Sequence, residues 1–170
     1  MRGLLGPVGL GQVRYPTAGN AYSEEEAQPF YVNAPFGIVL VHNGNLTNAA
    51  TLKKELARID RRHINTDSDT EVLINIFAHE LEVAARDLPL TPDIIFKAVS
   101  AVHKRLKGSY AVVALIAGFG LLAFRDPFGI RPLCFGEGDT PDGRQVMVAS
   151  ESVALEGTGH VMTRDVAPGE

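Results

Sequence analysis

The sequence predicts an α+β fold in which helices pack on antiparallel β-sheets, and three observations predict it. Apolar, β-branched segments lie in both the first and the last third of the chain, and three amphipathic helical segments lie between them. Turn residues join two of the later strands directly, as in an antiparallel pair. The order of strands, helices and strands differs from the regular alternation that builds a parallel α/β sheet.

Three strands are expected before the helices. Residues 8–15 and 28–32 have the composition of strands. Residues 36–42, Phe-Gly-Ile-Val-Leu-Val-His, form an apolar, β-branched run that is typical of a buried strand. This run meets residues 43–45, Asn-Gly-Asn, which are a strong turn signal. We therefore expect the buried strand to end there.

Three helices are predicted next, at residues 48–59, 69–86 and 92–107. Each has apolar side chains at the helical spacing that buries one face. Ser68 and Glu71 fit a capping box, in which the serine caps the helix and the glutamate reaches back to the serine N–H.

The rest of the chain is predicted to be β. Residues 110–117 and 121–125 flank a Gly-Phe-Gly turn, so they are expected to form a hairpin. Further strands are expected at residues 131–136, 145–150 and 160–166.

Composition excludes several classes of protein. A length of 170 residues with 45% hydrophobic residues suits one domain with a real core. A net charge of −4 without a basic run argues against nucleic acid as a partner, and no apolar stretch has the length of a membrane span. The single cysteine, Cys134, excludes an internal disulfide and a cysteine-based metal cage. We expect a soluble, cytoplasmic protein without a metal site.

Few residues stand out as candidates for chemistry, and each has a plainer interpretation. Asn43 and Gly44 could present an amide and a backbone N–H to an oxyanion, although the chemistry of a strand-ending turn alone explains the pair. Arg14 has the planar fork that suits a carboxylate, although most arginines are simply exposed. Asp69 could pair with a substrate ammonium, although the helix dipole alone stabilises a carboxylate there. Cys134 lies in an apolar strand, so we expect a core residue.

Short motifs along nearly the whole chain resemble, in their order, one family of enzymes. They are residues 13–19 (Val-Arg-Tyr-Pro-Thr-Ala-Gly), 27–30 (Ala-Gln-Pro-Phe), 42–46 (His-Asn-Gly-Asn-Leu), 66–71 (Thr-Asp-Ser-Asp-Thr-Glu), 125–133 (Arg-Asp-Pro-Phe-Gly-Ile-Arg-Pro-Leu), 148–152 (Val-Ala-Ser-Glu-Ser) and 165–170 (Asp-Val-Ala-Pro-Gly-Glu). They resemble the class II glutamine amidotransferases, and Tyr-Pro-Thr-Ala-Gly resembles the amidophosphoribosyltransferases in particular. The same segment argues against an asparagine synthetase.

The resemblance implies a fold, an activity and a set of site residues. The family's glutaminase domain is a four-layer αββα sandwich of the N-terminal-nucleophile hydrolase type, which we expect here in incomplete form. Asn43 and Gly44 match the oxyanion hole. Arg14, with Thr17 beside it, matches the residue that holds the α-carboxylate of L-glutamine, and Asp69 matches the residue that holds its α-ammonium. In the family an N-terminal cysteine attacks the glutamine amide, and a phosphoribosyltransferase domain joins the ammonia to phosphoribosyl pyrophosphate, which opens purine biosynthesis.

The chain departs from the family pattern at both ends. Family sequences carry the nucleophile and the first strands ahead of the Arg14 motif, and the phosphoribosyltransferase domain follows their glutaminase domain. Cys134 is internal and has no free α-amine to serve as base, so it does not replace the nucleophile. We interpret residues 1–170 as part of a glutaminase domain, inactive by itself. A non-catalytic glutamine-binding or regulatory module of the same fold is the alternative.

Cofactors and partners follow from the same resemblance. We expect no cofactor in this chain, and Mg²⁺ only for the phosphoribosyltransferase domain. The expected partners are L-glutamine and the rest of the same polypeptide, and a full-length protein is expected to be a homo-oligomer. Neither nucleic acid nor a membrane is expected as a partner.

Overall fold

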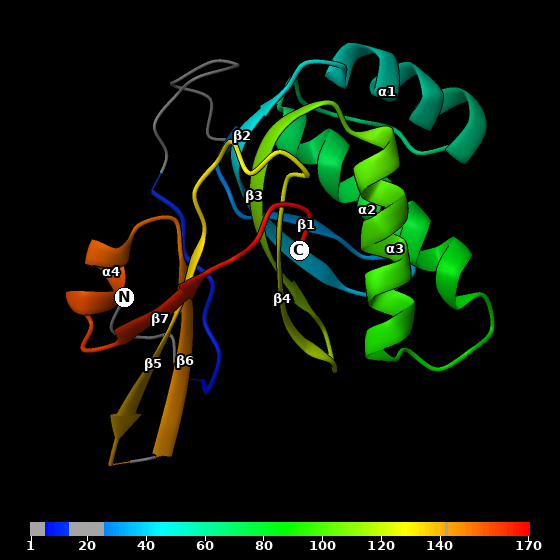
Figure 1. The fold of residues 1–170 in the computed structure, drawn as a ribbon. Helices are drawn as coiled ribbons and strands as arrows, with labels where there is room; N and C mark the ends of the chain where they lie inside the picture. The colour runs from blue at the N-terminus through cyan, green and yellow to red at the C-terminus, as the bar shows by residue number, and fades with distance from the viewer. Residues whose placement is uncertain (1–5, 14–25, 142) are drawn as a thin grey trace.

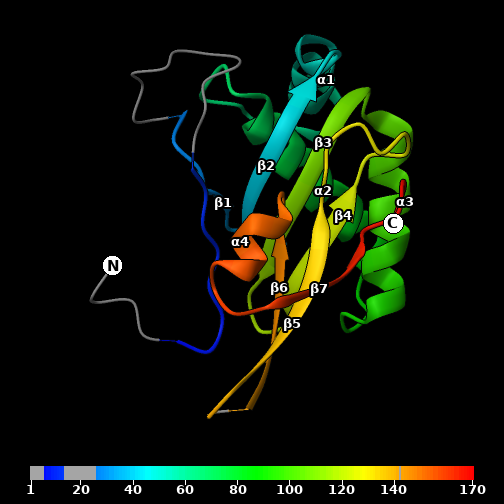
Figure 2. The same cartoon turned by 60° about the vertical axis from the view of Figure 1, so that its left-hand side comes forward.

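Two antiparallel sheets lie face to face in the computed structural model, which describes residues 6–13, 26–141 and 143–170 (Figures 1 and 2). The first sheet has the strand order β1-β2-β3-β4 and the second the order β6-β5-β7. The strands are β1 (Phe30–Val32), β2 (Ile38–Leu46), β3 (Gly108–Ile116), β4 (Gly120–Arg125), β5 (Cys134–Thr140), β6 (Gly143–Ala149) and β7 (Val161–Asp165).

Helices cover the outer faces of both sheets (Figure 1). The elements are α1 (Ala49–Glu55), a π-helical turn η2 (Leu56–Asp60), α2 (Asp69–Ala85), α3 (Pro92–Arg105) and α4 (Ser152–Glu156). The first four belong to the side of the first sheet, and α4 packs on β6 and β7. The layer order is therefore αββα, which confirms the expected fold class, with a last layer of one short helix. No helix among the described residues is long and apolar enough to cross a membrane.

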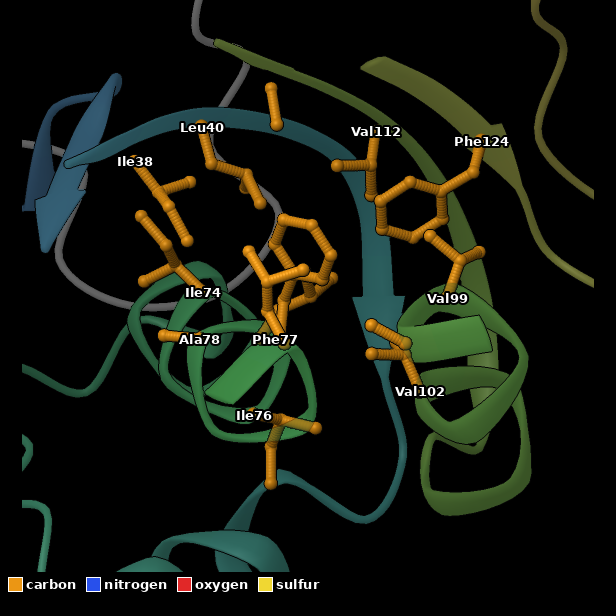
Figure 3. Close-up of a cluster of buried hydrophobic side chains, with 14 of the residues drawn as sticks. Ile38, Leu40, Ile74, Ile76, Phe77, Ala78, Val99, Val102, Val112 and Phe124 are labelled. Atoms are coloured by element: carbon orange, nitrogen blue, oxygen red, sulfur yellow. The ribbon is translucent and has the colours of Figure 1, made fainter. Parts of the chain in front are cut away.

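The main core lies between the first sheet and the helices α2 and α3. In Figure 3, Ile74 and Phe77 of α2 point toward the sheet, and Val99 of α3 lies beside Phe124 of β4. The ring centroids of Phe77 and Phe124 are 5.9 Å apart. Burying one such side chain contributes about 1.5–3 kcal/mol to the free energy of unfolding. The cluster therefore holds the start of α2 firmly beside β2.

Strand β2 does not end where the turn signal predicted. It runs through residues 43–45 to Leu46 and pairs with β3 along its whole length. Gly44 has a φ of 154°, and a Cβ at this position would lie 2.0 Å from the carbonyl oxygen of Ser109. Only glycine allows two backbones to approach so closely. The Asn-Gly pair therefore serves a tight strand pairing and not a turn.

Two expectations in the first half of the chain were also wrong. Residues 8–13 form no strand, and their two glycines leave few side chains that a strand could pack; residues 14 and 15 lie outside the described residues. Glu71 does not complete a capping box. Its carboxylate accepts the N–H groups of Asn65 (2.9 Å) and Thr66 (2.7 Å), although Ser68 still caps α2.

The second sheet and its helix also differ in part from the expectation. Strand β5 begins at Cys134 and not at residue 131, because the preceding residues form a loop around a buried aspartate. Helix α4 was not predicted, since one turn of helix is too short to show an apolar period. The three long helices lie close to their expected bounds, but the first ends in the π-helical turn η2.

A single buried carboxylate organises the loop between β4 and β5. Asp126 is 0% exposed, and its oxygens accept four backbone N–H groups. The donors are Tyr110 (3.3 Å), Phe128 (3.0 Å), Ile130 (3.1 Å) and Arg131 (3.2 Å). Burial raises the pKa of Asp126, but these donors together lower it more, so the pKa lies below its usual value. The loop is therefore built around a charged carboxylate.

Asp126→Asn should lower the free energy of unfolding at pH 7 by about 3 kcal/mol or more, because several buried N–H groups lose an anionic acceptor. The folded-state pKa is lowered, so this stabilisation is fully present above the unfolded-state pKa of about 4 and is lost as the pH falls through the folded value. Urea unfolding at several pH values measures both effects. The exposed Asp87→Asn is the control, and an equal loss in the two variants would contradict the role of Asp126.

Candidate functional site

The candidate residues gather at the end of β2, along an edge that β1 leaves open. Strand β1 pairs only with the first three residues of β2. Just beyond the two ends of β2, the N–H of Thr47 donates to the carbonyl of Lys107, and the carbonyl of Gly37 accepts the N–H of Ala117. Hydrogen-bonded pairs alternate along an antiparallel ladder, so it is the odd-numbered residues of β2 that bond to β3. Alternate N–H groups of a strand point to opposite edges. The N–H groups of His42, Gly44 and Leu46 therefore point to the open edge.

Side chains close this open edge on either side of Gly44. The N–H of His42 donates to Oε1 of Gln28 (2.6 Å), and Nε2 of Gln28 donates to the carbonyl of His42 (3.0 Å). The N–H of Leu46 donates to Oδ2 of Asp69 (2.9 Å). Between them, the N–H of Gly44 takes part in no hydrogen bond among the described residues. At an otherwise satisfied edge, one backbone donor thus has no partner within the part of the chain that the structure describes, and such donors can hold an oxyanion.

The side chain of Asn43 points toward the space between the two sheets. It lines a small cavity of about 80 Å³, together with Val41 and Ala111 of the first sheet and Ser150 after β6. Its Nδ2 donates to Oγ of Ser150 (3.4 Å), and its Oδ1 accepts from the guanidinium of Arg131. The amide of Asn43 therefore lies in a partly buried pocket, one residue before the N–H of Gly44 in the sequence.

Asp69 lies beside the buried imidazole of His42. Its Oδ1 is 3.7 Å from Nδ1 of His42, and Oγ1 of Thr70 is 3.2 Å from the same nitrogen. Burial lowers the pKa of His42, although the charge of Asp69 and the carbonyl of Ser109 act in the opposite direction. The ring is therefore neutral at neutral pH. The neutral ring therefore leaves the carboxylate of Asp69 able to pair with a substrate cation.

Cys134 belongs to the buried part of the second sheet, as the sequence predicts. It is 3% exposed, and its Sγ donates to the carbonyl of Ala149 (3.2 Å). Burial raises the pKa of its thiol, and the charge of Asp165 raises it further. Phe135 lines the larger cavity between the sheets, so the thiol of its neighbour points to the opposite face, toward α4. Cys134 is thus neither ionised nor directed at Asn43.

The predicted site residues are brought together only in part. Asn43, Gly44 and Asp69 lie at the same end of β2. His42 lies between Asn43 and Gly44 on one side and Asp69 on the other. Arg14 and Thr17 lie outside the described residues, so their role in holding a carboxylate stays a prediction. Among the described residues, no group of His, Cys, Asp and Glu side chains has an arrangement that could hold a metal ion.

Sequence reasoning missed the side chains that hold the site in place. These are Gln28, His42, Asp126, Arg131 and Ser150. For Asp126 a signal was present, because Asp followed by Pro-Phe-Gly is typical of a loop in which the carboxylate accepts backbone N–H groups. The others leave no such local signal, since their partners are far away in the sequence.

Known proteins similar to this chain are glutamine amidotransferases. A family described as "Glutamine amidotransferase domain" matches residues 18–157. The amidophosphoribosyltransferase of Pseudomonas aeruginosa is 58% identical over 170 residues, and that of Escherichia coli is 57% identical over 171 residues. Each alignment covers 100% of this chain and 34% of the relative. The chain thus spans about a third of the length of the curated relatives that it matches.

Solved structures give the same result. A glutamine phosphoribosylpyrophosphate amidotransferase from B. subtilis, complexed with ADP and GMP, superposes with a TM-score of 0.65 at 32% identity. A second structure, described as the allosteric regulatory enzyme of purine biosynthesis, has a TM-score of 0.68 at 34% identity. Both matches cover 92% of this chain and 30% of the other. From its family match, its relatives and its fold, the chain belongs to the glutamine amidotransferase domain family.

Proposed function

We propose that the chain is the glutaminase portion of an amidophosphoribosyltransferase. In the full-length enzyme this portion, completed by the nucleophile, hydrolyses the side-chain amide of L-glutamine, and another domain of the same polypeptide joins the ammonia to phosphoribosyl pyrophosphate to give 5-phosphoribosylamine. The observation that carries the proposal is the 58% and 57% identity, over the whole chain, to two proteins of that name. The proposal includes Mg²⁺ in the phosphoribosyltransferase domain, a homo-oligomeric full-length protein and a cytoplasmic location.

The open edge of β2 supports the first half of this reaction. A cysteine thiolate from another part of the polypeptide attacks the amide carbon, and the carbonyl π electrons move to the amide oxygen. The Nδ2 group of Asn43 and the N–H of Gly44 then donate to that oxyanion. Both donors are in place before the charge develops, so little reorganisation opposes the reaction.

The amino-acid end of the substrate is held by charge. In this proposal Asp69 pairs with the α-ammonium, and Arg14 and Thr17 hold the α-carboxylate. Asp69 suits this role because its Oδ2 is fixed by the N–H of Leu46 (2.9 Å), whereas the neutral His42 leaves its charge available. A fixed anchor places the amide in line with the nucleophile and the oxyanion donors.

Asn43→Ala should lower the glutamine-dependent kcat of the full-length enzyme by about 10²–10³, the usual effect of losing one oxyanion donor. An interaction made mainly in the transition state acts on kcat more than on KM. Synthesis from added ammonium salt should stay nearly unchanged, because it bypasses the glutaminase site. Comparing the two activities tests the oxyanion role, with the exposed Asn33→Ala as the matched control. Equal losses in both activities would show that Asn43 only shapes the fold.

Asp69→Asn should mainly raise the KM for glutamine, since an anchoring charged contact contributes about 2–5 kcal/mol. The new amide oxygen still accepts the N–H of Leu46, so the fold should persist. Asp69→Ala should in addition lower the free energy of unfolding by about 1–3 kcal/mol, because that N–H loses its acceptor. Steady-state kinetics and urea unfolding separate the two effects. Arg14→Ala should raise the KM as well, and the exposed Asp67→Asn serves as the control.

A protein consisting of residues 1–170 alone should release no ammonia from glutamine, because its one thiol is buried and faces away from Asn43. In the full-length enzyme, Cys134→Ser should leave glutamine-dependent kcat unchanged and reduce stability by only about 1 kcal/mol. An ammonia-release assay on both proteins measures this. Ammonia release by residues 1–170 that disappears with Cys134→Ser would overturn the core assignment of Cys134.

A further inference from the structure

We propose that Arg131 is a positioning residue, which fixes the side-chain amide of Asn43 with its nitrogen toward the reacting amide oxygen. This inference rests on the proposed glutaminase function and adds a residue to it. The side-chain amide of any asparagine can be turned in two ways. The oxygen and nitrogen of the amide have nearly the same shape, yet only the nitrogen can donate to an oxyanion.

The chemistry of the neighbours decides which way the amide points. The hydroxyl of Ser150 can donate or accept, so its contact with Asn43 permits either orientation. A guanidinium has only donors. Because the guanidinium of Arg131 contacts one end of the amide, that end has to be the oxygen. The nitrogen is therefore the end turned away from Arg131, on the side of Ser150, where it can donate.

Arg131 is itself held rigidly by its backbone. Its N–H donates to Oδ2 of the buried Asp126 (3.2 Å), and its carbonyl accepts from Nε of Arg125 (2.5 Å). Pro132 follows and restricts the backbone of Arg131 further. The side chain thus extends from a fixed point on the second sheet's loop to Asn43 on the first sheet, 88 positions away in the sequence.

A contribution to stability does not explain why an arginine occupies position 131. Its Nε is buried and has no hydrogen-bond partner among the described residues. A buried donor without a partner is unfavourable for folding. A methionine of similar length would fill the same space without that donor. Among the described residues, Asn43 is the one polar side chain that the guanidinium contacts, which supports a role in the reaction.

The test is a double-mutant cycle in the full-length enzyme. Arg131→Met should lower glutamine-dependent kcat by about tenfold, because freeing one immobilised side chain costs about this factor. The KM for glutamine, the ammonium-dependent activity and the thermal stability should change little. Arg131→Lys keeps a donor-only cation and should recover most of the loss. The exposed Arg144→Met, on β6, is the matched control.

The decisive comparison is made in the Asn43→Ala background. If Arg131 acts through the Asn43 amide, adding Arg131→Met there should cause no further loss of kcat. Additive losses, no loss from Arg131→Met alone, or a matched loss of both activities would overturn the positioning role. If Asn43→Ala itself leaves glutamine-dependent kcat unchanged, the oxyanion assignment in the proposed function fails first. The two failures are therefore distinguishable.

Discussion

The open edge of β2 is the constraint on which the rest of the site depends. Sheet edges carry backbone N–H groups that need partners, and β1 covers only the start of this strand. Gln28, just before β1, and Asp69, at the start of α2, provide acceptors for the N–H groups of His42 and Leu46. The N–H of Gly44 is left between them. A donor that no described residue satisfies, beside a fixed carboxylate, follows from how this one edge is closed.

Two features connect that edge to the core, a close backbone approach and a buried carboxylate. The close approach of Gly44 to the carbonyl of Ser109 keeps β2 and β3 paired to the end of β2. The carboxylate of Asp126 binds the N–H of Tyr110 in β3 and the N–H of Arg131 in the loop. Arg131 then reaches Asn43. The side chain of Asn43 is thus held by a series of contacts that runs from Tyr110 of the first sheet through Asp126 to Arg131.

Much of the fold could be predicted because its signals are local. The apolar spacing in residues 69–86 and 92–107 predicted α2 and α3, and the Gly-Phe-Gly turn predicted the β3–β4 hairpin. Local signals were wrong where another segment of the chain had the stronger effect. The Asn-Gly pair predicted a turn, but pairing with β3 extends β2 through it. Glu71 predicted a capping box, but the N–H groups of residues 65 and 66 bind its carboxylate instead.

The sequence by itself determined the fold class, the family resemblance and the candidate residues Asn43, Gly44 and Asp69, because these are carried by local composition and by motifs. Only the tertiary structure decided how those residues act together. The contact of Asn43 with Arg131 and that of Leu46 with Asp69 join residues 88 and 23 positions apart. Such contacts exist only after two sheets and a helix have packed, since packing brings a donor within hydrogen-bond distance of its acceptor.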